Sequence, residues 1–207
     1  MRRFYKFKSA QEGSVSVEMS FLVTLMVLLT AGVMECGFAF WQWNSAQQAA
    51  RHGARLAATS DPIANDILNM TGLGNGVEAG DPFPDYVRHC SGRTASCNQG
   101  SYNALALNAI VYGRENDGRC EKTVSERRGI CDVVSSIQSE NIEITYANSG
   151  QGRAGSPADP APLITVTIKD LEFDFVLLGS FFPDSFRSIP PVSVSVMSED
   201  LRSNNRF

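Results

Sequence analysis

Gly13-Ser14-Val15-Ser16-Val17-Glu18 is the stretch that decides the fold, because it joins a basic leader to a long apolar run. Residues 1 to 13 carry four Lys and Arg side chains. Met19 to Trp41 follows the stretch and is broken by little except Glu35. Within this run, residues 21 to 40 supply about 20 mostly apolar positions, enough for a helix that crosses a bilayer core of about 30 Å. The sequence therefore predicts one membrane helix whose basic end stays in the cytoplasm.

A glutamate five residues after a glycine, at the start of such a run, has two interpretations. In the first, the chain has a simple single-pass anchor, and its first charged residue lies at the lipid headgroups. In the second, the junction is a type IV prepilin-like processing site. A prepilin peptidase would then cut between Gly13 and Ser14, and Glu18 would stay in the helix to meet the new amino terminus of a neighbouring subunit. We favour the second interpretation.

The overall charge argues against several function classes. The chain has a formal net charge of −4, and the leader contributes +3, so its removal would leave a side-chain charge of −7. A chain that acidic lacks the basic face of a nucleic-acid binder. We find no phosphate-binding loop with its lysine, no nucleophile elbow and no HExxH motif. The sequence predicts no enzyme, no cofactor, no metal and no small-molecule substrate.

The cysteines predict a region outside the cytoplasm. Cys36 lies in the apolar run, and four more cysteines lie beyond it. An even set in such a region suggests two disulfides. Sequence order favours Cys90–Cys97 and Cys120–Cys131, since each pair closes a short polar loop, although four cysteines allow three pairings. A zinc site is the rival interpretation, and the wide spacings count against it.

The first helix is expected to continue past the membrane, from about Ser14 to about Ala58. The segment after Trp43 is rich in alanine, the strongest helix former. Its small residues recur at three- and four-residue steps and so form one stripe that another helix or a sheet can approach closely: Ala46, Ala50, Gly53 and Ala57. Arg51 and Arg55 share a different face. Glu35 is expected at the outer membrane boundary, either as an interfacial carboxylate or paired with a basic residue of another protein.

The C-terminal third changes period from helical to alternating. Three runs place β-branched or aromatic residues on one face and polar residues on the other, as half-buried strands do: Ile142–Tyr146, Ile164–Ile168 and Val192–Val196. They predict an antiparallel sheet with one wet side. The apolar segment 171–182 is too short to span a membrane. It is interpreted either as a buried connector under the sheet or as a lip that touches lipid or a neighbouring subunit.

These features predict an α+β fold: a long N-terminal transmembrane helix packed on a small antiparallel β-sheet, as in pilins, with a disulfide-pinned irregular insertion. Four regions are expected. They are a leader (1–13), a transmembrane and extended helix (14–59), a helical and loop insertion with four cysteines (60–140) and a sheet region (141–207). In the insertion, Asp61 and Pro62 are expected to start a short helix over residues 63–70, and a second helix is expected from Tyr102 to Tyr112.

The pieces together resemble the TadE-like family, the pseudopilins of tight-adherence (Flp) pili. Gly13 with Glu18, the apolar run through Glu35-Cys36-Gly37, and Ala49-Ala50-Arg51-His52-Gly53-Ala54-Arg55 carry the resemblance. Residues 163–168 and 192–197, with the apolar segment between them, are similar to the late strands of that family. One position departs from the pattern, because pilins of this apparatus often have an aromatic residue where this chain has Met19.

The resemblance implies a minor pilin or an assembly-initiating subunit of the pilus. It implies as partners the inner membrane, a prepilin peptidase, and other pilins and pilus-assembly proteins. The N-terminus would be cytoplasmic and the C-terminal domain periplasmic, with the protein either in the bacterial inner membrane or within the pilus. Two alternatives stay open: a pseudopilin of a type II secretion apparatus, and an uncleaved membrane-anchored periplasmic binding domain.

Overall fold

The computed structural model describes residues 12–113, 118–120, 127–155, 160–176, 179 and 187–198. The leader before residue 12 lies outside these ranges. The helical elements are α1 (Glu12–Ala58), η1 (Asn65–Asn69), α2 (Ala104–Tyr112), η2 (Ile130–Asp132) and η3 (Ser139–Asn141). The strands are β1 (Val87–Ser91), β2 (Ser96–Cys97), β3 (Ile142–Asn148), β4 (Pro162–Ile168), β5 (Leu171–Glu172), β6 (Ser188–Ile189) and β7 (Val192–Met197).

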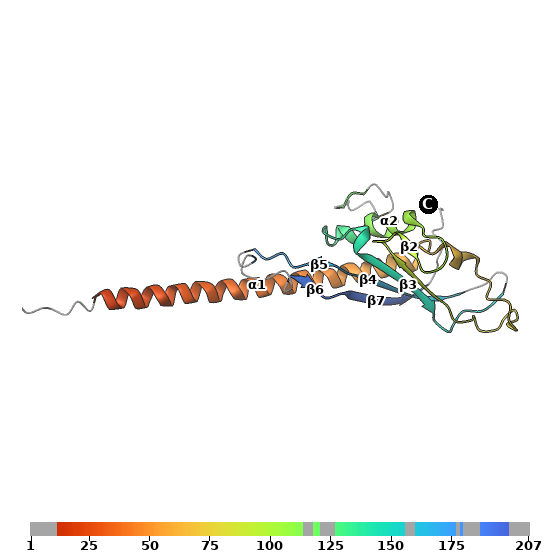
Figure 1. Ribbon diagram of the computed structural model, residues 1–207, viewed down its shortest axis with the longest axis horizontal. Helices are drawn as coiled ribbons and strands as arrows, with labels where there is room; N and C mark the ends of the chain where they lie inside the picture. The colour runs from red at the N-terminus through yellow and green to blue at the C-terminus, as the bar shows by residue number, and fades with distance from the viewer. Residues whose placement is uncertain are drawn as a thin grey trace, which may run out of the picture.

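One helix sets the shape of the molecule. α1 has 47 residues, which makes it about 70 Å long. Its N-terminal half stands alone, and its C-terminal half runs along the sheet (Figure 1). Helix α1 ends at Ala58 as expected and begins two residues before the predicted start. The predicted α+β arrangement, a long apolar helix packed on an antiparallel sheet, is confirmed.

The sheet has five strands in the order β2-β1-β3-β4-β7, and all neighbours are antiparallel. The three predicted strands are β3, β4 and β7. The expected alternation of apolar and polar side chains is confirmed in β3 and β4, whose apolar side chains are buried at every second position. On the opposite face, the hydroxyls of Thr165 and Ser195 lie 2.8 Å apart, and those of Thr167 and Ser193 lie 2.9 Å apart. These polar pairs suit a face left to water.

The small-residue stripe of α1 packs on the sheet. Ala46, Ala50, Gly53 and Ala57 are all buried, and α1 contacts β4 and β7. A Cβ added at Gly53 would lie 2.8 Å from Cγ1 of Ile130, closer still to its Cδ1, and 3.6 Å from Cγ1 of Val166. A larger residue at position 53 would therefore require the Ile130 side chain to move, and the predicted close approach is confirmed.

Helix α2 was predicted correctly, whereas the start of the preceding short helix was not. Asn103 caps α2 by accepting a hydrogen bond from the Ala106 amide. The expected helix at Pro62 is a 3-10 turn that begins only at Asn65. The reason is tertiary: the Ile63 amide donates to the Tyr146 hydroxyl, and the Ile63 carbonyl accepts from the Asn103 amide. These bonds fix the backbone at Ile63, and Ala64 is extended rather than helical.

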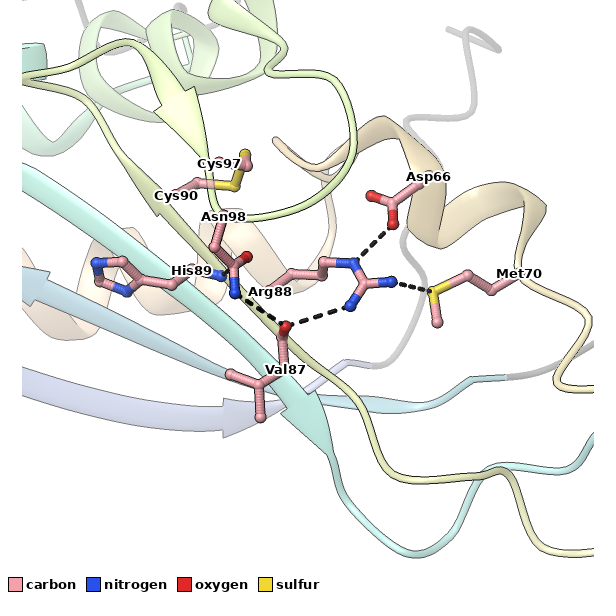
Figure 2. A network of polar contacts seen from close by, with 8 residues as sticks. All are labelled: Asp66, Met70, Val87, Arg88, His89, Cys90, Cys97 and Asn98. Carbon is pink, nitrogen blue, oxygen red and sulfur yellow. Dashed lines mark hydrogen bonds and ion pairs between the residues drawn. A yellow bond between two sulfur atoms is a disulfide. The ribbon is translucent and has the colours of Figure 1, made fainter.

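Both predicted disulfides are present, Cys90–Cys97 and Cys120–Cys131. The first joins directly opposite residues of β1 and β2. The region expected as helix and loop thus also contains two strands, and β1 pairs with β3 as part of the main sheet. Figure 2 shows the polar contacts that hold the hairpin of β1 and β2. Arg88 on β1 donates through Nε to Asp66 on η1 at 2.6 Å, and Asn98 accepts from the His89 amide at 2.9 Å.

Candidate functional site

The N-terminal half of α1 carries an unusual surface. Its large apolar side chains are exposed nearly without interruption from Val15 to Trp41. A water-soluble surface rarely shows contiguous apolar area of this extent. Within the described residues, α1 is the one helix long and apolar enough to cross a membrane, and its most apolar window is not buried by the rest of the chain. This half of α1 is consistent with a single membrane anchor.

The residues predicted to act in processing and assembly lie at the start of α1. Gly13 and Ser14 fall in its first turn, and Glu18 is exposed one turn later. Positions 14 and 18 are four residues apart and therefore share a face of the helix. Among the described residues, Glu18 has no ion-pair partner in its own chain.

Glu35 is the exception on this exposed half. It is only 4% exposed, although its neighbours Val33 and Met34 are 67% and 72% exposed. The amide of Val176 donates to its Oε2 at 3.2 Å. The expected interfacial carboxylate is thus covered by a distant part of its own chain.

A second polar side chain of α1 holds the same distant segment. Gln42 donates through Nε2 to the Asp174 carbonyl at 2.8 Å, and its Oε1 accepts from the Asp174 amide at 2.9 Å. Glu35 and Gln42 are seven residues apart, which places them two turns apart on one face. Ala31 and Ala39, on the same face, are half-buried. We call residues 173–176 the lip, since they lie along this face of α1.

The lip leaves the domain through a short ribbon of β5 and β6. Leu171 and Ile189, at the base of the ribbon, are buried in the core. The Phe173 amide donates to the Arg187 carbonyl at 2.6 Å and prolongs the pairing. Val176, at the far end of the lip, is 68% exposed. The buried-connector interpretation therefore holds at the base and not at the end, while Leu177, Leu178, Phe181 and Phe182 lie outside the described residues.

A groove of about 700 Å³ opens above the lip, where α1 meets the domain. Phe38 and Trp41 form one wall, residues 133–141 form another, and the β5–β6 ribbon forms the third. Its charged lining residues are Glu140, Asp170, Glu172, Asp174 and Arg187. Asp170 already accepts from Arg93 at 2.5 Å. The groove marks the junction between the anchor and the domain.

The two histidines lie apart and have separate partners, and Nε2 of His89 also lies 3.7 Å from Oε2 of Glu143. Nε2 of His52 lies 3.0 Å from the Arg128 carbonyl, and Nδ1 of His89 lies 3.0 Å from the Thr145 hydroxyl. Across the part of the chain that the structure describes, no group of three His, Cys, Asp or Glu side chains could hold a metal ion.

Comparison with known families bears on this same half of the molecule. The family model described as TadE-like protein matches residues 13–55. This segment is similar to that family. The match begins at Gly13, covers Glu18 and the apolar run, and ends within the small-residue stripe. The predicted resemblance is confirmed over these residues. No curated protein and no solved structure matches the chain.

Sequence reasoning missed the docking of the lip on α1. The contacts join residues 132 and 141 positions apart, so local periodicity could not reveal them. One signal was available in the TadE-like segment: Glu35 and Gln42 are polar residues spaced by seven in a helix that is otherwise apolar there. Such spacing on one face indicates a partner for that face.

Proposed function

We propose that this protein is a minor pilin or assembly-initiating subunit of a tight-adherence pilus, processed by a prepilin peptidase between Gly13 and Ser14. The observation that carries the proposal is the TadE-like match, which begins at the glycine of the expected cleavage site. The long exposed apolar half of α1 supports it as well. The proposed role is structural and not enzymatic.

In this proposal, the exposed half of α1 has two successive surroundings. Before assembly its apolar side chains lie in lipid, with the N-terminus cytoplasmic and the folded domain periplasmic. During assembly they pass into a bundle of helices from neighbouring subunits. Both surroundings remove the same side chains from water, so the transfer between them involves a modest free-energy difference.

Glu18 would give the transfer its direction. A charged side chain inside lipid is unfavourable by a few kcal/mol at the bilayer centre and less near the interface. Cleavage after Gly13 creates an amino group on Ser14, and the Ser14 amine of one subunit can neutralise Glu18 of the next. Cleavage also removes the leader, whose net charge of +3 opposes extraction from the cytoplasmic side.

The test is N-terminal sequencing of the full chain purified from its native membrane, with and without the peptidase gene. We expect a mature chain that begins at Ser14 only when the peptidase is present. A Gly13→Leu variant should keep its leader, because a bulky side chain would obstruct the junction. Glu18→Gln should be cleaved normally and fail to assemble, which separates processing from assembly.

A chain that keeps its leader in both strains would contradict the proposal. It would favour the uncleaved periplasmic binding domain, for which the groove at the anchor junction would be the first place to look for a ligand. Cleavage together with incorporation into a secretion apparatus would instead favour the type II secretion pseudopilin.

A further inference from the structure

We propose that the lip, residues 173–176, enters the outer leaflet of the membrane beside α1, so that the domain has a second lipid contact besides its anchor. This inference rests on the membrane-anchoring part of the proposed function. It adds to the anchor helix a second lipid-contacting surface, formed by the lip.

The lip lies at membrane depth. Val176 bonds to Glu35, which precedes Trp41 by six residues, about 9 Å along a helix. Tryptophans gather at the level of the lipid headgroups, so a point 9 Å nearer the middle of the apolar run falls at the acyl boundary. Met34, Glu35, Phe38 and Val176 together line a hollow of about 230 Å³ at this level.

The polarity of the lip follows this depth. Glu172 and Asp174 are exposed and lie on the domain side, and Asp174 is held at the level of Gln42. Val176 is exposed, apolar and furthest along α1 toward the membrane. The exposed side chains of residues 172–176 thus change from the charged Glu172 and Asp174 to the apolar Val176 in the direction in which lipid replaces water.

Several backbone groups of the lip already have hydrogen-bond partners. In hydrocarbon an unsatisfied backbone amide or carbonyl is unfavourable by several kcal/mol. The Val176 amide donates to Glu35, and both backbone groups of Asp174 bond to Gln42. The contact with the Val176 amide also involves the Glu35 carboxylate, which is buried although its neighbours Val33 and Met34 are exposed.

Lipid is the occupant that these observations favour. The exposed side of Val176 continues the apolar surface of α1 at Met34 and Phe38, so whatever surrounds that part of the anchor also surrounds the end of the lip. In a single membrane-inserted subunit, that surrounding is the outer leaflet. A neighbouring subunit in this place is the competing outcome.

The experiment measures the depth of the lip in the full chain. Single cysteines at positions 34, 105, 172 and 176, each in a Cys36→Ser background with both disulfides intact, receive a spin label. The protein is reconstituted at low density into vesicles of phosphatidylethanolamine and phosphatidylglycerol. Accessibility to oxygen, which concentrates in lipid, is compared with accessibility to a water-soluble nickel chelate. Each replaced residue other than Glu172 is a large exposed apolar one, and Glu172 is exposed, so the labels should not disturb the core.

We expect the ratio of oxygen to nickel accessibility to exceed unity at position 34 and at position 176. It should fall below unity at position 105, on α2, with position 172 between the two extremes. A ratio at position 176 that equals the ratio at position 105, while position 34 remains in lipid, would contradict the proposed lipid contact of the lip. The proposed membrane anchor would still stand. Low accessibility to both reagents at 176 would mean that protein covers it, which also overturns the inference. An aqueous ratio at position 34 would contradict the anchor itself.

Discussion

The two halves of α1 belong to one uninterrupted helix, yet they solve opposite packing problems. From Val15 to Trp41 most side chains are large, apolar and exposed, whereas from Ala46 to Ala58 the face that meets the sheet carries small, buried side chains. Large side chains maximise apolar area toward a fluid surrounding, which adapts to them. Small ones let a helix approach a rigid sheet closely. Side-chain size therefore distinguishes the half that packs on the sheet from the half proposed to lie in lipid.

The greatest loss of stability should come from placing a large side chain in the half of α1 that packs on the sheet. Gly53→Leu places a large side chain against Ile130 and Val166 in the packed half, and overpacking typically destabilises by about 1–3 kcal/mol, with the upper end expected here because a whole leucine side chain is added. Gly37→Leu is the matched control, because nothing lies within 4 Å of a Cβ added there. Urea unfolding of the full chain in detergent, followed by near-ultraviolet circular dichroism, measures both. Equal loss in the two variants would refute the contrast.

A smaller effect tests how the segment that follows α1 is held against β3. Tyr146 is fully buried, and its hydroxyl accepts from the Ile63 amide at 3.1 Å. Tyr146→Phe removes this acceptor and leaves the buried Ile63 amide without a hydrogen-bond partner. This should lower the free energy of unfolding by about 1–3 kcal/mol. Tyr112→Phe serves as the control, since Tyr112 is only partly buried. An unchanged denaturation midpoint for Tyr146→Phe would show that another group replaces the hydroxyl.

The same tyrosine predicts a pH dependence confined to the domain. Burial raises the pKa of Tyr146 well above its usual range. The unfolded chain then releases the proton at lower pH than the folded chain does. Stability from this group is complete below a pH of about 10 and declines as the pH rises above it. Tyr146→Phe should lose this part of the alkaline decline, as seen in denaturation midpoints from neutral pH upward. A decline of the same size in both proteins would assign it to other groups.

The smallest effect sharpens the contrast where the exposed half is locally covered. Glu35→Ala removes the acceptor of the Val176 amide, so that amide should exchange its hydrogen faster. The free energy of unfolding of the domain should change by no more than about 0.5 kcal/mol. Glu35→Gln keeps an acceptor oxygen and should slow the exchange again. Hydrogen exchange resolved at Val176 distinguishes the variants. Equal exchange in all three proteins would mean that the bond does not hold the lip.

Sequence patterns predicted the parts of this fold that depend on local periodicity. The alternation in β3, β4 and β7 and the small-residue stripe of α1 each state which face is buried, and the structure agrees. The strand β1 carries no such alternation, because its sequence Val-Arg-His-Cys-Ser buries only Cys90. It is a strand because β3 offers it an edge and a disulfide ties it to β2.

The candidate functional residues of α1 also fall into those that local spacing reveals and those that depend on distant contacts. The positions of Gly13 and Glu18 relative to the apolar run could be read from spacing alone. The contacts of Glu35 and Gln42 could not, because each depends on a segment more than one hundred residues away. The expected helix start at Pro62 failed for a similar reason, since bonds to Tyr146 and Asn103 hold the neighbouring backbone extended.

Because α1 has no break between its two halves, the domain would follow the tilt of the anchor if the exposed half lies in a membrane as proposed. Membrane helices tilt by about 20° on average, and a tilt of that size would carry Ala58 sideways by about 9 Å relative to Trp41. A thinner or thicker bilayer, which changes the tilt of the anchor, would thus move the whole sheet by a comparable distance. In the proposed arrangement, bilayer thickness would therefore set the direction in which the folded domain faces.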